Sequence, residues 1–416
     1  MQDAITAESA LDLITLFEPF APAGGQGTDD ARRLGSHVSI SRLAGYDDVN
    51  FRVTDARSRR AYVLKIHNAA DSAASGAVFH AHNAVMQHIA AAGLVRSNTP
   101  MPLADGSGFI ATVQLGGGGP RAVRLLTFLE GDIIGPRRLG PELQRALGAF
   151  IANLVTALQG FDDPALHDQT HDWFMECAAS TITRKLPLVQ GLDQEQRRLI
   201  ESAAARLQGA VCISGDDLPR QVCHADANEN NLLISADASQ VTGILDWGDA
   251  AHCWRVVELA VAAAYAALLE ASQGPGKGEE EGAVAPGSSG KGAGHEIGAG
   301  EGGGGEGARH EGAVEGGGGG AFDAPLRVAA NVVAGYLGAG GPLTPAEQRM
   351  LGPLMGARVA ISLVNGAIAA RANPSNSEYL LATQKPGWRL LRLLQGLRES
   401  EVAAALLPPA VTAAQP

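Results

Sequence analysis

One stretch of the sequence, residues 222–258, constrains the fold more than any other part of the chain. It reads VCHADANENNLLISADASQVTGILDWGDAAHCWRVVE. Its first half has the pattern His-x-Asp-x4-Asn, formed by His224, Asp226 and Asn231, and its second half is an apolar strand that runs into Asp246. Short apolar runs bounded by polar residues are typical of strands. The stretch therefore predicts two short strands whose ends carry two acids and an amide.

This order of side chains matches the needs of kinase-type phosphoryl transfer. There the loop aspartate accepts the proton of the attacking hydroxyl, the asparagine holds a metal ion, and the later aspartate holds the metal that bridges the phosphates. The alternative is an ordinary β-hairpin whose polar turn residues only satisfy backbone groups. The full pattern is much rarer than a lone His-x-Asp, and it favours the kinase-like interpretation.

Length and charge narrow the class of protein. The 416 residues leave room for two or three domains, or for one two-lobed unit with an insertion, and the 45% hydrophobic content supports a sizeable core. A net charge of −12 argues against a nucleic-acid partner, which calls for a basic surface.

Other features concern the compartment. The four cysteines have no C-x-x-C spacing and fit reduced thiols in a cytosolic protein. The N-terminus carries acids and no basic region, so we expect no secretory signal and a cytoplasmic location. The apolar run 254–271 has two charged residues near its start, Arg255 and Glu258, and directly follows the candidate metal loop. We therefore predict a buried core helix and no membrane span.

The first third of the chain predicts a sheet with one helix. Residues 37–41, 49–53 and 61–66 alternate or run apolar as strands, with a turn at Gly45 between the first two. Lys65 lies within the third strand. Lysine is rarely buried without a partner, so it either faces solvent on an edge strand or grips the phosphates of a nucleotide, as the strand lysine of kinases does.

The next helix lacks an expected acid. Residues 77–92 have helical spacing, and in protein kinases this helix carries the glutamate that pairs with the strand lysine. No glutamate occurs between Lys65 and Gly93, and His80 is the candidate in its place. A histidine could orient the lysine by a hydrogen bond, although it would not neutralise it in the same way.

The remaining pattern predicts two lobes. Residues 109–115 and 121–129 read as strands around the glycine turn 116–119, which no Lys-Ser/Thr follows, so a hairpin is favoured over a phosphate loop. Helical patterns then dominate. We predict an α+β fold of the bilobal, protein-kinase-like kind, with a cleft at the join of a small β-rich N-lobe and a larger, mainly helical C-lobe.

The predicted boundaries follow composition. Residues 272–320 hold 21 of the 53 glycines of the chain and almost no large apolar side chains, so this segment is predicted to be a disordered insertion. The predicted units are listed in chain order: an N-lobe over 1–131, a C-lobe segment with both loops over 132–271, the insertion over 272–320, and C-lobe helices with a tail over 321–416.

With these residues in view, the chain resembles the aminoglycoside phosphotransferase/choline kinase-like superfamily, and within it the hydroxylysine kinase group. The resemblance rests on these segments: LAGYDDVNFRV (43–53), YVLKI (62–66), VRLLTFL (123–129), HADANENNLLI (224–234), VTGILDWGD (241–249) and YLLATQKPGW (379–388). The first, third and last separate this group from antibiotic-modifying or choline-directed relatives.

The resemblance implies roles for individual residues. It gives Asp226 as the catalytic base, Asn231 and Asp246 as ligands of Mg²⁺, and Lys65 as the phosphate-binding lysine. It also gives the other nucleotide-binding residues, in the covering hairpin and in the linker between the lobes: Gly45, Tyr46, Asp47, Leu126 and Phe128. Besides His80, two positions depart from the pattern. Ala225 stands where relatives usually have glycine, a change tolerated if its backbone is not left-handed, and Trp247 replaces a commoner Phe.

The implied activity is that of a small-molecule kinase with GTP or ATP as co-substrate, acting on the hydroxyl of 5-hydroxy-L-lysine in lysine degradation. Asp249 and Glu229 are candidates for attracting the acceptor's amine, and Arg255 is the nearest candidate for its carboxylate. Homoserine, an aminoglycoside or a choline-like amino alcohol are alternative acceptors, and a non-catalytic nucleotide-binding pseudokinase is the alternative of another class. The acceptor, the choice of nucleotide and the oligomeric state stay open.

Overall fold

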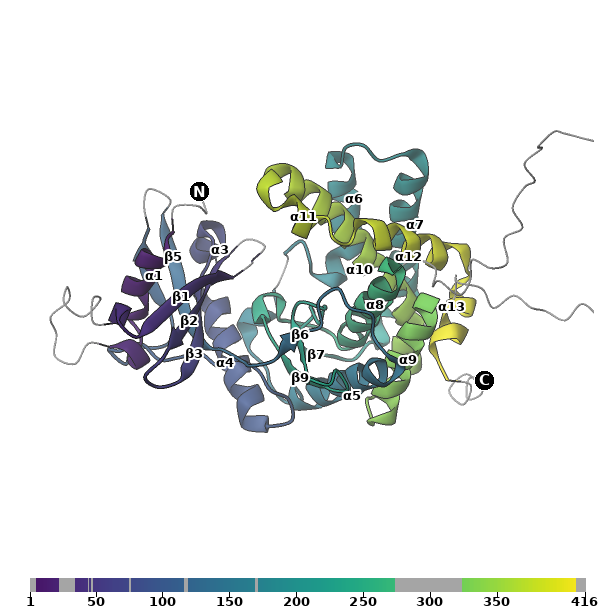
Figure 1. Ribbon diagram of the computed structural model, residues 1–416. Coiled ribbons are helices and arrows are strands. Elements are labelled where there is room, and N and C mark those ends of the chain that lie inside the picture. The colour runs from purple at the N-terminus through teal and green to yellow at the C-terminus, as the bar shows by residue number, and fades with distance from the viewer. Residues whose placement is uncertain are drawn as a thin grey trace, which may run out of the picture.

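A computed structural model of the protein describes residues 5–21, 34–43, 45, 48–74, 76–115, 119–168, 171–273 and 324–408. A β-rich part holds the N-terminal elements, and a larger, mostly helical part holds the rest (Figure 1). This arrangement confirms the predicted α+β class. The predicted insertion lies outside the described residues, apart from residues 272 and 273.

The β-rich part is built on one antiparallel sheet with the order β1-β2-β3-β5-β4. Its strands are β1 (Val38–Leu43), β2 (Val49–Asp55), β3 (Arg60–Ile66), β4 (Ala111–Gln114) and β5 (Pro120–Thr127). Along β2, buried residues alternate with partly buried ones, as expected when one face of a strand meets a core. The register pairs Lys65 with Asn50 on one side and Arg124 on the other, which places the lysine in the middle of the sheet.

Two of the three helices next to the sheet bury their apolar residues in different cores. Helix α1 (Ala7–Ile14) buries Leu13 and Ile14 in the same apolar cluster as the sheet, while the short α3 (Ala69–Ala74) packs on β5. Helix α4 (Gly76–Ala92) instead places its apolar face in the core of the helical part. The β-rich part is therefore tied to the helical part through α4, and the predicted boundary at residue 131 stays a prediction.

The helical part is organised around two buried helices. Its helices are α5 (Pro141–Ala157), α6 (Ala178–Lys185), α7 (Gln194–Ser214), α8 (Val256–Ser272), α9 (Ala324–Gly338), α10 (Pro345–Ala372), α11 (Ser377–Leu380), α12 (Gln384–Gly396) and α13 (Glu399–Leu406). Helix α8 is buried along almost its whole length, which confirms the predicted core helix. Helix α10 is long and apolar enough to cross a membrane by length and composition, but 83% of its most apolar window is buried inside the protein.

Helices α5 and α9 approach each other closely through two glycines. A Cβ atom added to Gly148 would lie 1.9 Å from the carbonyl oxygen of Val332, and one added to Gly335 would lie 2.1 Å from that of Arg145. Only glycine fits either position, because the two backbones are in contact there. This contact fixes α9, the first helix after the predicted insertion, against the core.

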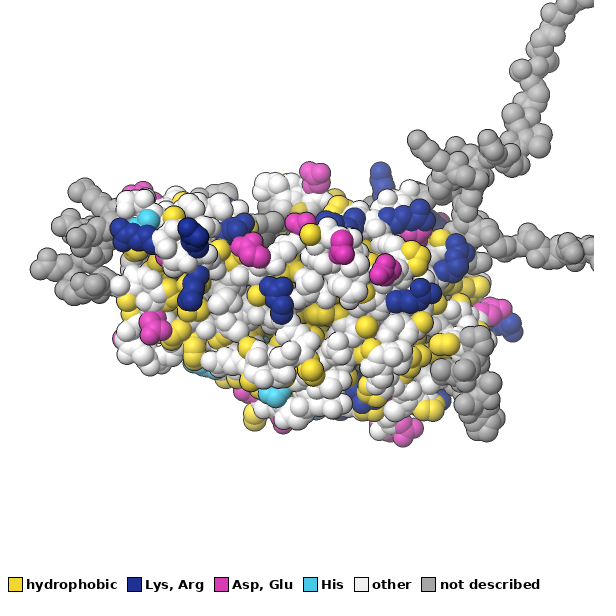
Figure 2. Space-filling view, turned by 60° about the horizontal axis from the view of Figure 1, so that its bottom comes forward, with side chains coloured by type: hydrophobic (Ala, Val, Ile, Leu, Met, Phe, Trp, Pro, Cys, Tyr) yellow, Lys and Arg dark blue, Asp and Glu magenta, His cyan; other side chains and the backbone are white. Residues whose placement is uncertain are grey.

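Two small sheets lie within the helical part. One contains β6 (Asp132–Ile133), β8 (Leu232–Ile234) and β9 (Val241–Ile244), and the other pairs β7 (Arg220–Cys223) with β10 (Ala251–Trp254). Strands β8 and β9 confirm the two strands predicted on either side of the turn in the 222–258 stretch. On the face shown in Figure 2, basic and acidic side chains are interspersed over both parts of the molecule.

Candidate active site

The hairpin of β8 and β9 brings the two predicted metal ligands together. Leu232 lies opposite Ile244 in this hairpin, so Asn231 and Asp246 stand at the same end of it. The backbone N–H of Leu245 donates to the carbonyl oxygen of Asn231 at 2.8 Å. The spacing of the sequence motif is thus the length of a short hairpin whose first strand follows Asn231 and whose second strand leads into Asp246.

His224 joins this hairpin to the loop that carries Asp226. Its ring is completely buried. The backbone N–H of Asp226 donates to its Nδ1 at 3.2 Å, so the ring proton is on Nε2, which donates to the carbonyl oxygen of Leu245 at 2.8 Å. Burial lowers the pKa of His224, which keeps the ring neutral. The histidine of the motif therefore positions the two loops relative to each other.

Glu258, in the first turn of α8, contacts the backbone of the loop that carries Asp226. This fully buried carboxylate accepts a hydrogen bond from the backbone N–H of His224. Burial raises the pKa of Glu258 to about 7, although hydrogen bonds from the backbone of His224 and Ala225 act to lower it. No lysine or arginine partner of this carboxylate is present among the described residues.

Ala225 corrects one expectation. Its φ is 64°, in the left-handed region that favours glycine. The expectation that alanine is tolerated at this position required a backbone that is not left-handed, and the structure does not meet this condition. Asp246 is left-handed as well, with a φ of 58°. Backbone strain is therefore located at two positions of the site.

Asp226, the predicted base, is held by three side chains. Its Oδ2 accepts from Nδ2 of Asn231 at 2.7 Å and from Nδ2 of Asn228 at 2.8 Å, and its Oδ1 accepts from Nη2 of Arg358. Burial raises the pKa of Asp226 to about 6, with Arg358 acting to lower it and Asp249 to raise it. A carboxylate with this pKa is ionised at neutral pH and basic enough to accept a proton from a substrate.

The residues predicted as metal ligands fit a hard divalent cation. Nδ2 of Asn231 donates to Asp226, at 2.7 Å to Oδ2 and 3.0 Å to the carbonyl oxygen, which leaves Oδ1 of the amide for a cation. The Asp246 side chain is 49% exposed. Mg²⁺ binds through carboxylate and amide oxygens together with water and phosphate, and this donor set is of that kind.

Lys65 reaches Asp246 across the two parts of the molecule. Its Nζ lies 2.8 Å from Oδ1 of Asp246 and 3.3 Å from Oδ2 of Asp48. Burial acts to lower the pKa of Lys65, but Asp246 and Asp48 outweigh it and the pKa is raised. The same contact, against the effect of burial, lowers the pKa of Asp246 to about 2. The structure therefore brings the predicted phosphate-binding lysine and a predicted metal ligand into contact.

Asp48, which the sequence analysis missed, provides the acid that α4 lacks. It pairs with Lys65 and, at 3.1 Å, with Nδ1 of His67, and it accepts from the backbone N–H of Asn68 at 3.0 Å. His80, the predicted replacement for the glutamate, is exposed. The counter-charge of Lys65 thus comes from the β1–β2 hairpin and not from the helix. The strand register indicates this role of Asp48: Val49 lies opposite Ile66, so the preceding residue, Asp48, lies beside His67.

The predicted nucleotide-binding residues of the hairpin and the linker are only partly described. Gly45 needs to be glycine, because a Cβ there would lie 2.7 Å from the carbonyl oxygen of Asp48. Tyr46 and Asp47 lie outside the described residues. In the linker, Leu126 pairs with β3 inside the sheet and Phe128 donates its N–H to the carbonyl oxygen of Ala61 at 3.0 Å. Their part in binding a nucleotide stays a prediction.

The arginine in contact with Asp226 is Arg358, and Arg255, the candidate for the acceptor's carboxylate, has another partner. Arg255 donates from Nε and Nη2 to the carboxylate of Glu347, at 3.0 Å and 2.7 Å, and so is committed to a structural pair at the start of α10. Arg358, from the middle of α10, contacts Asp226 instead. The sequence does indicate a role for Arg358, because it is a lone arginine within the apolar run 354–364 and a buried arginine needs a partner.

Two further acids lie near Asp226. Asp249, predicted to attract an amine, has Oδ1 3.7 Å from Nδ1 of His171, and burial raises its pKa to about 6. Burial also raises the pKa of Glu229 to about 7, while Asp226 adds to this rise. The surroundings of the predicted base are therefore acidic, with Arg358 as the opposing charge.

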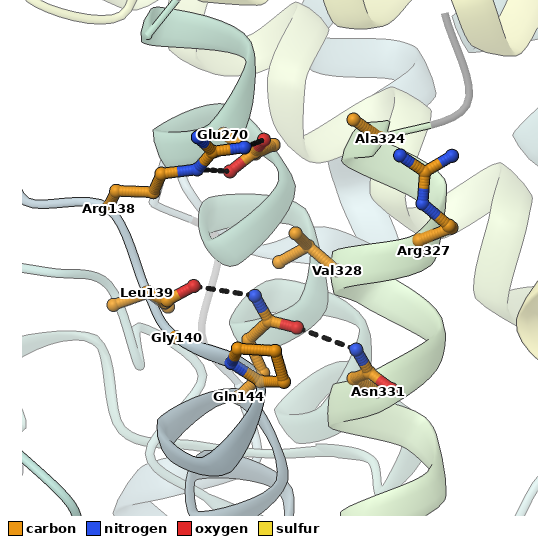
Figure 3. A pocket seen from close by; sticks show the side chains of 10 residues that line it. Arg138, Leu139, Gly140, Gln144, Glu270, Ala324, Arg327, Val328 and Asn331 are labelled. Carbon is orange, nitrogen blue, oxygen red and sulfur yellow. Dashed lines mark hydrogen bonds and ion pairs between the residues drawn. The ribbon is translucent and has the colours of Figure 1, made fainter. Parts of the chain in front are cut away.

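A pocket of about 480 Å³ lies elsewhere in the helical part, between α5, α8 and α9 (Figure 3). Arg138 and Glu270 face each other at its rim through paired hydrogen bonds, and Gln144 links the carbonyl oxygen of Leu139 to Asn331. None of the predicted site residues lines it.

Comparison with known sequences places these residues in a family context. A sequence model of the phosphotransferase enzyme family matches residues 39–287, more than half of the chain. The hydroxylysine kinase of Mus musculus is 25% identical over 392 residues, covering 89% of this chain and 88% of the relative. That of Bos taurus is 26% identical over 382 residues, covering 86% and 85%. The resemblance noted in the sequence is thereby confirmed.

Solved structures agree on the fold. An amicoumacin kinase in complex with AMP-PNP and Ca²⁺ superimposes with a TM-score of 0.60 at 13% identity, covering 96% of this chain and 98% of that structure. A microcompartment-associated aminopropanol kinase also gives 0.60, at 17% identity, covering 89% and 98%. These likenesses support the kinase-like, bilobal architecture.

Proposed function

Because this chain belongs to the phosphotransferase enzyme family, we propose that it is a small-molecule kinase that phosphorylates the hydroxyl group of 5-hydroxy-L-lysine. The phosphoryl donor in this proposal is GTP or ATP, used together with Mg²⁺. The observation that carries the proposal is the convergence of Lys65 on Asp246, at 2.8 Å, beside the hairpin that also presents Asn231. The acceptor is proposed from the similarity to hydroxylysine kinases over most of the chain.

Each residue then has a defined task. Asp226 orients the acceptor hydroxyl and accepts its proton, a contribution of roughly 10²–10⁴-fold to the rate. Lys65 exchanges Asp246 for phosphate oxygens, and Asp48 keeps the lysine in place during the exchange. Oδ1 of Asn231 and the carboxylate of Asp246 hold Mg²⁺, which when bound neutralises charge on the phosphates.

The free protein supports this division of tasks. Arg358 and two asparagines hold the Asp226 carboxylate in one orientation before any ligand binds. Preorganised groups of this kind act without being rearranged during the reaction. Asp48 also removes the one argument for a non-catalytic pseudokinase, which was the missing acid partner of Lys65.

The test is a phosphoryl-transfer assay on the purified protein with Mg²⁺. 5-Hydroxy-L-lysine, homoserine, an aminoglycoside and choline are offered in turn with GTP and with ATP, and release of nucleoside diphosphate is measured. We expect the largest kcat/KM with 5-hydroxy-L-lysine. A larger value with another acceptor overturns the substrate, and no transfer to any acceptor overturns the kinase activity.

A further inference from the structure

Arg358 is held more rigidly than a partner of Asp226 requires. It projects from the middle of α10 and is 2% exposed. Its guanidinium lies over the rings of Trp173 and Tyr265, with centroid distances of 4.9 Å and 5.4 Å. Stacking on aromatic rings fixes the plane of a guanidinium, which favours recognition of planar groups such as carboxylates.

Much of this guanidinium has no hydrogen-bond partner. Nη2 donates to Asp226, and Tyr265 interacts with the guanidinium through its hydroxyl as well as its ring, but Nε and Nη1, both buried, form no hydrogen bond with the described residues by distance and angle. An arginine carries N–H donors on all three nitrogens. Buried polar groups in folded proteins are normally paired, so the unpaired donors of Arg358, and Nη1 at the end of the guanidinium in particular, point to a ligand group as their partner.

Other unpaired polar atoms lie in the same surroundings. Both ring nitrogens of His171, whose Nδ1 is 3.7 Å from the Asp249 carboxylate, and Oε2 of Glu229 are buried without a hydrogen-bond partner among the described residues. Glu229 and Asp249 carry the charge opposite to that of Arg358. The site therefore offers both an unpaired cationic donor and acidic groups next to the predicted base.

We propose that the unpaired Nη1 of Arg358 donates to the carboxylate of the acceptor, and that Glu229 and Asp249 face its ammonium groups. The acceptor is then a hydroxylated amino acid, with its hydroxyl on Asp226 and its carboxylate on the arginine that also holds Asp226. This inference rests on the proposed function and deepens it, because it assigns acceptor recognition to residues that the family match does not identify. It replaces Arg255, which is occupied by Glu347.

An arginine that served only to orient Asp226 would need one donor. That role accounts for the Nη2 contact and leaves the two unpaired nitrogens without a purpose. The two explanations differ in what they predict for the acceptor. If Arg358 binds the carboxylate, kcat/KM is higher for acceptors that have a carboxylate than for those that lack one. If Arg358 only positions Asp226, it changes kcat/KM for all acceptors alike.

The first experiment changes the acceptor and leaves the protein intact. The native enzyme is assayed with 5-hydroxy-L-lysine, with its carboxamide, and with 1,5-diamino-2-pentanol, which lacks the carboxylate. We expect kcat/KM to fall roughly 10- to 100-fold for both analogues, mainly through KM, as expected for loss of hydrogen bonds to a charged group. Equal kcat/KM for all three overturns the inference while the proposed function stands.

The second experiment asks whether Arg358 is the source of that preference. In Arg358→Lys and Arg358→Met, the ratio of kcat/KM for 5-hydroxy-L-lysine to that for 1,5-diamino-2-pentanol should fall toward one. Arg255→Met is the matched control, and its ratio should equal that of the native enzyme. An unchanged ratio in the Arg358 variants, with both acceptors slowed alike, overturns the inference.

The outcomes remain separable if the Arg358 variants fail to fold, because the comparison of acceptors on the native enzyme then decides. Absence of transfer to every acceptor overturns the proposed function and this inference with it. Transfer without a carboxylate preference overturns the inference alone.

Discussion

Lys65 and Arg358 are both cations buried beside an acid, one in the β-rich part and the other in the helical part. Lys65 contacts two carboxylates, Asp48 and Asp246, at 3.3 Å and 2.8 Å. Arg358 contacts one, and two of its nitrogens have no partner among the described residues. The cation of the first cluster lies between two carboxylates, whereas two nitrogens of the second cation are left without a hydrogen bond to the described residues.

This difference has an energetic meaning. A buried donor without a partner costs about 1–3 kcal/mol, so a ligand group that pairs with such a donor of Arg358 gains free energy of this order. A ligand at Lys65 must instead displace an existing ion pair. The cluster around Arg358 thus has more to gain from a polar ligand than the cluster around Lys65, which fits a division between acceptor recognition and phosphate binding.

The largest effect is expected when the acid that Arg358 contacts is removed. Asp226→Asn should lower kcat by roughly 10²–10⁴-fold, because the amide cannot accept the proton of the acceptor. Nucleotide binding, measured by titration calorimetry with a non-hydrolysable analogue, should be retained. Asp237→Asn, in an exposed turn, is the matched control and should keep its rate. Normal turnover in Asp226→Asn would contradict the assignment of the base.

A second prediction concerns pH and the carboxylate behind the Asp226 loop. Burial raises the pKa of Glu258 from 4.5 to about 7. Between these pH values the folded state binds more protons than the unfolded state, so its stability falls as the pH rises, by about 3 kcal/mol in total. Chemical denaturation at pH 5 and pH 8 measures the loss. In Glu258→Gln the loss should shrink by this amount, and an identical pH dependence in both proteins would rule out Glu258 as its source.

The Lys65 cluster can be weakened from the side of the β1–β2 hairpin. Asp48→Asn leaves Lys65 with Asp246 alone, so we expect the free energy of unfolding to fall by about 1–3 kcal/mol and the KM for the nucleotide to rise. Thermal denaturation and initial rates measure the two effects. His80→Ala, on the exposed face of α4, is the control and should change the stability by less than about 0.5 kcal/mol. If His80→Ala weakens nucleotide binding as much as Asp48→Asn does, the helix and not the hairpin supports the lysine.

The smallest expected effect relieves strain near Asp226. Ala225 has a φ of 64°, which glycine adopts without penalty. Ala225→Gly should therefore raise the free energy of unfolding by about 0.5–1 kcal/mol, because the relief of left-handed strain exceeds the added entropy of the unfolded chain. Equilibrium denaturation tests this, and Ala227→Gly in the same loop, where φ is not positive, should be destabilising instead.

Much of the candidate site follows from the sequence because its geometry is local. A short hairpin must bring Asn231 and Asp246 together, and a lysine inside an apolar strand must have a partner. The strands and the long helices were predictable for the same reason, since their apolar periodicity is written into consecutive residues. These parts of the prediction needed no knowledge of how distant segments pack.

The contacts that the sequence did not predict join distant segments. Arg255 was chosen because it follows the Asp246 loop closely in sequence, but packing gives it to Glu347, and Arg358 arrives from another helix. Asp48 is not identified by the kinase pattern, because that pattern places the acid on the helix after the lysine strand. Setting the strand register first would have shown that residue 48 lies beside His67.

The position of Asp48 has a consequence for control of the enzyme. Protein kinases are switched off by moving the helix whose glutamate pairs with the lysine. Helix α4 carries no acidic residue and is anchored in the core of the helical part, so sliding it would take no charge away from Lys65. An inhibitor that displaces this helix would therefore not remove a carboxylate from Lys65. A change that removes this counter-charge from Lys65 would have to move the hairpin that carries Asp48.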